Sequence, residues 1–86
     1  MNWVKSELIA MLRWMLVQGI IGGKHTPEGR VMKRIAHLPR DEQNEIKKEW
    51  EHCIKQLQWV FRMKKTGEWH VSLNPKVLAE IKQLTG

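Results

Sequence analysis

Residues that crosslink a chain or anchor it in a membrane are scarce in this sequence. Cys53 is the single cysteine among 86 residues, which excludes an internal disulfide and favours a reducing compartment. The longest apolar run, residues 8–17, is interrupted by Arg13 and is much shorter than the ~20 residues of a membrane-spanning helix. The N-terminal residues include an acid, Glu7, and show no cleavage site, so no signal peptide is expected. These absences predict a cytoplasmic protein without a membrane partner.

Patterns that support metal binding or catalysis are also missing. The histidines are His25, His37, His52 and His70. Neither they nor Cys53 show paired CxxC or HxxxH spacing, so no metal site is expected. Without a nucleophile elbow or a glycine-rich phosphate loop, we expect no enzyme activity, no cofactor and no small-molecule substrate. Gly22 and Gly23, followed by Lys24, leave open an anion site at the start of the next helix.

Positive charge is in excess but unevenly distributed. The formal net charge is +6, from 15 basic and nine acidic residues, which favours a polyanionic partner. Residues 40–58 hold four basic and five acidic side chains, so this stretch alone is net −1. The excess positive charge therefore lies elsewhere in the chain.

Residues 41–57 show the clearest periodicity. Apolar side chains recur in steps of three and four, at Ile46, Trp50, Cys53, Ile54 and Leu57. This spacing predicts a helix with one buried stripe. The opposite side carries Asn44, Lys48, Glu51 and Lys55.

Two short strands are predicted after this helix, at residues 59–63 and 69–73, with Gly67 in the turn between them. Trp69, Val71 and Leu73 alternate with His70 and Ser72, which predicts that the first three face the core. Phe61 and Met63 are expected to face the same core, with Arg62 and Lys64 outward.

The N-terminal helix is expected over residues 3–21 and has two apolar stripes. We assign the first stripe to the core: Leu8, Leu12, Met15 and Leu16. The second stripe lies on the opposite side: Trp3, Ala10, Trp14, Val17 and Ile21. A helix that is apolar on two sides needs two surfaces to pack on, so we predict a homodimer through the second stripe. The alternative is that the last helix and the strands cover it.

Two further helices complete the predicted order. Thr26, as a cap, and Pro27 predict a helix over residues 27–37, with a connection of about three residues to the helix that follows. Asn74 and Pro75 repeat this start. The last helix has an inner side made of Val77, Leu78, Ile81 and Leu84.

Residues 57–75 resemble the recognition-helix end, wing and final strand of winged-helix DNA-binding domains. Residues 20–27 and 71–75 together are similar to small stand-alone archaeal winged-helix proteins, mostly without an assigned role. The resemblance covers nearly the whole chain and implies a role like that of a transcription regulator. Trp59 departs from the pattern, because such domains often have a glycine there, and the acidic recognition helix is a second departure.

The predicted fold is therefore α+β and mainly helical: a single winged helix-turn-helix domain over residues 1–86, with a three-helix core, a β-hairpin wing and a C-terminal helix. The predicted partner is duplex DNA, with a regulatory outcome. Base reading is expected from Asn44, Lys48, Glu51 and Lys55. Phosphate contacts are expected from Arg30, Lys33, Arg34, Arg40, Lys47, Arg62, Lys64 and Lys65.

Two alternatives stay open. One is a winged-helix protein-interaction module that does not bind DNA, which the acids of residues 41–51 would suit. The other is RNA binding. We disfavour it because Phe61 and Trp69 are expected to serve the core rather than to stack on bases.

Overall fold

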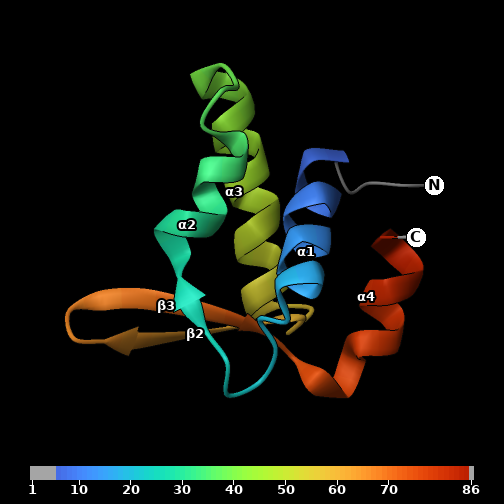
Figure 1. Cartoon of the computed structure of the whole chain (residues 1–86). Coiled ribbons are helices and arrows are strands. Elements are labelled where there is room, and N and C mark those ends of the chain that lie inside the picture. The colour runs from blue at the N-terminus through green and yellow to red at the C-terminus, as the bar shows by residue number, and fades with distance from the viewer. Residues whose placement is uncertain (1–5, 86) are drawn as a thin grey trace.

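The computed structural model describes residues 6–85 (Figure 1). Its fold is built around a long helix that is followed closely by a β-hairpin. The elements are α1 (Ser6–Gln18), β1 (Thr26–Pro27), α2 (Glu28–Met32), the 3-10 turn η1 (Lys33–Ile35), α3 (Arg40–Lys55), β2 (Val60–Lys65), β3 (Glu68–Leu73), the 3-10 turn η2 (Pro75–Val77) and α4 (Leu78–Thr85). The predicted α+β, mainly helical class is confirmed. Within the described residues, no helix combines the length and the apolar character needed to cross a membrane.

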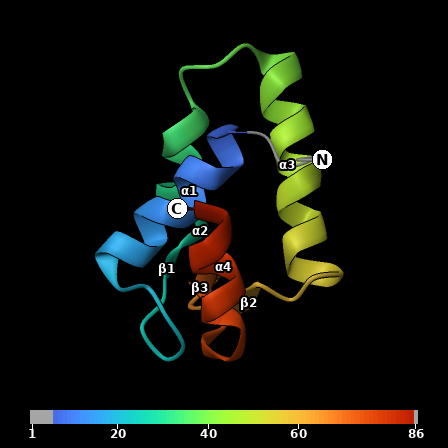
Figure 2. The same cartoon turned by 90° about the vertical axis from the view of Figure 1, so that its right-hand side faces the viewer.

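The helices gather beside one end of a small sheet, and the hairpin projects away from them (Figures 1 and 2). The sheet is antiparallel with strand order β1-β3-β2. Helix α1 contacts α2, α3, α4 and β3, so it lies at the centre of the packing. The side chain of Arg13 on α1 donates a hydrogen bond to the carbonyl of Thr85, which ties α4 to α1.

One hydrophobic core joins the helices to the sheet. Its fully or almost fully buried apolar residues are Leu8, Met11, Leu12, Met15, Ile20, Val31, Ile35, Ile46, Trp50, Cys53, Val60, Val71, Leu73 and Ile81. The predicted core stripe of the first helix and the stripe of residues 46–57 both belong to this core, with Leu16, Ile54 and Leu57 half-buried at its edge. Cys53 is a free thiol, and burial raises its pKa to about 12, with a smaller contribution from the charge of Glu49.

Helix α1 ends three residues earlier than predicted. Gly19 has φ +68°, its N–H donates to the carbonyl of Leu16, and the N–H of Ile20 donates to that of Met15. These two bonds form a Schellman cap, in which the left-handed residue satisfies the last carbonyls of a helix. Ile21 therefore lies outside the helix and bridges to Leu73. The predicted start at Trp3 lies outside the described residues.

The segment expected to be one helix over residues 27–37 is divided into a strand, a short helix and a 3-10 turn. The prediction that Thr26 caps the helix is wrong, because Thr26 pairs with Val71 in the sheet and Pro27 is the cap residue. Asn74, in contrast, does cap the last helical segment: its side chain accepts a hydrogen bond from the N–H of Lys76, 3.0 Å away.

The hairpin is longer than predicted and closes through a two-residue turn. Lys65 pairs with Glu68, and the turn residues Thr66 and Gly67 have φ of +47° and +84°. Positive φ at both positions is the type I′ geometry that matches the twist of a hairpin. The strands therefore keep pairing up to the tip.

The predicted faces of β2 are wrong. Directly opposed residues of an antiparallel pair lie on the same face, and Arg62 pairs with the hydrophobic core residue Val71 and contacts Glu28 of α2 and Glu51 of α3, whereas Phe61 pairs with Ser72 on the other face. Arg62 therefore faces the helices, and Phe61 is exposed on the other face. A shift of one residue moves every side chain of a strand to the opposite side.

The burial of β3 also departs from the alternation that the sequence indicates. Val71 and Leu73 are buried as predicted, but Trp69, one strand pair from the hairpin turn, is 49% exposed. Ser72, expected outside, is fully buried. His70 is half-buried, and its Nδ1 lies 2.8 Å from Nδ1 of His25, so the two rings tie the loop before β1 to β3.

Candidate nucleic-acid interface

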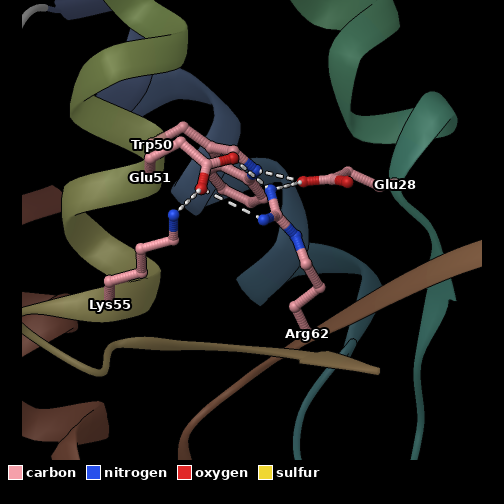
Figure 3. A network of polar contacts seen from close by, with 5 residues as sticks. All are labelled: Glu28, Trp50, Glu51, Lys55 and Arg62. Atoms are coloured by element: carbon pink, nitrogen blue, oxygen red, sulfur yellow. Dashed lines mark hydrogen bonds and ion pairs between the residues drawn. The ribbon is translucent and has the colours of Figure 1, made fainter. Parts of the chain in front are cut away.

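An ion-pair network joins the hairpin to two helices (Figure 3). Arg62 on β2 donates through Nη2 to Glu28 Oε2 at 2.6 Å and to Glu51 Oε2 at 2.5 Å, and through Nη1 to Glu51 Oε1 at 3.1 Å. The indole N–H of Trp50 donates to the same Glu28 oxygen at 2.6 Å. Lys55 approaches Glu51 Oε1 at 3.5 Å from the solvent side. The network connects α2, α3 and β2 through a single guanidinium.

The members of the network differ in burial. The side chains of Arg62 and Glu28 are 19% and 16% exposed, whereas that of Lys55 is 68% exposed. The hydrogen bond from Arg62 is the main cause that holds the pKa of Glu51 below its ordinary value, against an opposing effect of burial. The same bond is the main cause that raises the pKa of Arg62. The guanidinium is thus paired with two carboxylates and contributes little positive potential at the surface.

This network changes how two predicted DNA contacts are placed. Arg62, expected on phosphate, is turned toward the helices, and Glu51, expected to read bases, is held by Arg62. The contacts of Glu28 and Trp50 in this network were not predicted from the sequence. One side of α3 carries the predicted base-reading residues Asn44, Lys48, Glu51 and Lys55. Because Glu51 is bonded to Arg62 of β2, this side of α3 is turned toward the base of the hairpin.

The other predicted contacts are exposed. On α3 these are Asn44, Lys48 and Lys55, with Arg40 and Lys47 beside them. On α2 and η1 they are Arg30, Lys33 and Arg34, and near the hairpin tip Lys64 and Lys65. The guanidinium of Arg34 lies 4.9 Å from the ring centroid of Trp14 on α1. The exposed basic residues therefore lie in three regions: α3, the segment of α2 and η1, and the hairpin tip.

A groove runs between α2 and the hairpin. It has a volume of about 610 Å³ and is lined by Pro27, Glu28, Gly29, Arg30, Met32, Lys33, Glu68 and Trp69. The Nζ of Lys64 lies 5.1 Å from the ring centroid of Trp69, and Cζ of Arg62 lies 5.8 Å from it. The expectation that Phe61 and Trp69 serve the core is wrong, because both are exposed on the projecting hairpin.

The stripe predicted to form a dimer is not one continuous exposed surface in the part that the structure describes. Ala10 and Val17 are exposed, Val17 at 75%, whereas Trp14 is half-buried and Ile21 has left the helix. Trp3 lies outside the described residues. The dimer stays a prediction.

Among residues 6–85, no three His, Cys, Asp or Glu side chains are grouped as a metal ion would require. No protein-family model, no curated protein and no solved structure matches this chain.

Proposed function

We propose that this chain is a winged-helix domain that binds duplex DNA and acts as a cytoplasmic transcriptional regulator. The order α1-β1-α2-α3-β2-β3, with β1 pairing at the inner edge of the hairpin, supports the winged-helix assignment. In this proposal α3 enters the major groove and the hairpin follows the phosphate backbone beside it. The major groove is wide enough to admit one helix, and base-edge contacts there carry sequence information.

The observation that carries the proposal is the Arg62 network. The guanidinium of Arg62 donates hydrogen bonds of 2.5–3.1 Å to Glu28 on α2 and Glu51 on α3. These bonds set the position of the hairpin relative to both helices. With Arg62 and Glu51 paired to each other, the base contacts of the proposal are Asn44, Lys48 and Lys55, the last after release from its exposed ion pair with Glu51. Lys64 and Lys65 bind phosphates at the hairpin, and Arg30 and Lys33 extend that contact along the backbone.

Replacing Lys64 and Lys65 together by alanine is expected to weaken duplex binding roughly 10-fold at ~100 mM salt. Two lost phosphate contacts should also reduce the slope of log affinity against log salt by about 1.8, because each contact contributes about 0.9. Fluorescence anisotropy with a labelled duplex, titrated at several salt concentrations, measures both quantities. Arg62 is left unchanged, so the fold stays intact.

The matched control is Lys76→Ala with Lys82→Ala, which removes the same charge from the exposed surface of η2 and α4. That variant should keep nearly the wild-type affinity and slope. Equal losses in both variants would mean that only net charge matters, and the proposed wing contact would then be abandoned.

A protein-interaction module is the second candidate, and the exposed apolar side chains of Val17 and Phe61 favour it. In this alternative the partner binds to α1 and to the face of the hairpin that carries Phe61, rather than to α3. Absence of any binding to random duplex at ~50 mM salt, where non-specific contacts persist, would support it over DNA binding.

We also propose that two copies associate through the outer side of α1. Val17→Glu would place a charge on that side near the end of α1 without touching the core, because Val17 is 75% exposed. Light scattering should show a dimer for the wild type and a monomer for Val17→Glu, with Gln18→Glu as a control of equal charge one residue away. A monomeric wild type would show that α1 makes no such contact.

A further inference from the structure

The groove between α2 and the hairpin combines an accessible aromatic ring with unpaired positive charge. Trp69 forms part of its wall and is 49% exposed, although a tryptophan in a small domain is usually among its most buried residues. The groove's volume of about 610 Å³ is within the roughly 300–1,000 Å³ range of small-ligand sites. The site is thus large enough for a planar group to lie against the ring.

The charges around the groove favour an anion. Arg30 and Lys33 on its α2 side are exposed and make no ion pair within residues 6–85, and Lys64 lies over the ring of Trp69. The carboxylate of Glu28 is already paired with Arg62. Glu68 is the one acid of the lining that lacks such a strong partner, since its contact with His70 is 3.8 Å long. Two cations therefore line the groove and a third lies over its aromatic ring, against one acid without a strong partner.

The ring of Trp69 is held in position before any ligand arrives. Trp69 pairs directly with Lys64 across the two strands, and Arg62 lies on the same face of the hairpin. Arg62 is in turn fixed by Glu28 and Glu51. A platform that is already ordered loses little conformational freedom when a flat group stacks on it.

A planar ring beside phosphates is the chemistry of a nucleotide, but the faces of bases inside a duplex are covered by their neighbours. We propose that the groove binds an unpaired base adjoining the duplex, stacked on Trp69, with its phosphates on Arg30, Lys33 and Lys64. The inference rests on the proposed DNA binding and names the preferred substrate: duplex with a single-stranded extension. Base stacking on an aromatic side chain is sequence-tolerant, so no base preference is expected.

The experiment compares three labelled probes of one duplex sequence: blunt-ended, with a short oligothymidine overhang, and with an abasic overhang of equal length. Wild type is expected to bind the oligothymidine overhang roughly 10-fold more tightly than the blunt duplex. The abasic overhang keeps the phosphates but lacks the base rings, so its affinity should exceed that of the blunt duplex by much less. Trp69→Ala should bind blunt duplex as wild type does and lose the preference for the overhang.

Phe61→Ala is the matched control, because Phe61 is an exposed aromatic residue on the opposite face of the same hairpin. This variant should keep the preference. Equal wild-type affinity for all three probes, a Trp69→Ala variant that still prefers the overhang, or an abasic overhang that binds as tightly as oligothymidine would each overturn the inference. Binding of free oligothymidine that depends on Trp69, without any binding of blunt duplex, would overturn the proposed duplex function and leave the base site standing.

Discussion

Replacing Arg62 by alanine is expected to lower the free energy of unfolding by about 2–3 kcal/mol. Removing one partner of a buried ion pair typically costs roughly 3–5 kcal/mol, because the remaining charge is left without compensation. The loss here is smaller, since Glu51 lies partly in solvent and water can reach it after the change. Urea denaturation followed by far-UV circular dichroism, with linear extrapolation to water, gives the value.

Lys55→Ala is the control within the same network. Lys55 is 68% exposed and pairs with Glu51 at 3.5 Å along the helix, so its loss should cost no more than about 0.5 kcal/mol. A double-mutant cycle of Arg62→Ala and Glu51→Gln isolates their coupling. Similar midpoints for Arg62→Ala and Lys55→Ala would show that the guanidinium does not hold the hairpin to the helices.

Acid titration gives the Arg62 variant a second readout. Glu51 has a lowered pKa in the folded protein, so its ionised form stabilises the fold above its ordinary pKa, and this contribution is lost as pH falls through the lowered value. The hydrogen bond from Arg62 is the largest cause of that lowering. In Arg62→Ala the stability should therefore fall less steeply as the pH drops below 4.5, the ordinary pKa of Glu51.

The sequence was informative where one periodicity decided the structure. The stripe of Ile46, Trp50 and Cys53 predicted α3 to within a few residues, because three- and four-residue steps leave one way to bury the large side chains. The hairpin was also predicted, but not the faces of β2. Phe61 and Met63 looked like core residues by hydrophobicity, and the register instead aligned Val60 and Arg62 with Leu73 and Val71, the hydrophobic core residues of β3.

The polar network could not be read from the sequence. Arg62 was assigned to the solvent because it alternates with Phe61 and Met63, which were expected to face the core. Its partners Glu28 and Glu51 are 34 and 11 residues away, and only the packing of α2 against the hairpin and α3 brings them together. Strand β1 was missed for a related reason: its two residues, Thr26 and Pro27, match a helix start as well as a strand, and pairing with β3 decides between them.

The basic residues of the candidate site were predicted from the sequence, but the exposed aromatic ring of Trp69 was not. Lys64 and Lys65 lie near the hairpin tip as the sequence indicated, since the turn at Gly67 exposes both ends of its strands. Trp69 was assigned to the core by strand alternation. Alternation predicts which face a residue is on, whereas burial also depends on how far along the strand the helices extend. Trp69 lies one strand pair from the turn and borders the groove beside α2 instead of packing in the core.

Trp50→Ala is expected to have the largest effect of any single change argued here, a loss of about 3–5 kcal/mol. The side chain is 1% exposed within the core, and its indole N–H donates to Glu28 at 2.6 Å, so the change leaves both a cavity and a carboxylate with one donor fewer. A domain of this length has a stability of roughly 4–13 kcal/mol, so this loss ranges from about a quarter of the stability to all of it. Thermal and urea denaturation measure the loss.

Two variants separate the causes of this loss. Trp50→Phe keeps an aromatic ring but removes the hydrogen bond to Glu28, so it should cost about 1–3 kcal/mol less than Trp50→Ala. Trp69→Ala deletes the same side chain from an exposed position and should cost less than about 1 kcal/mol. If Trp50→Ala proved no more destabilising than Trp69→Ala, the packing of α3 against α1 and the sheet described above would be wrong, and with it the position of the hairpin relative to α3.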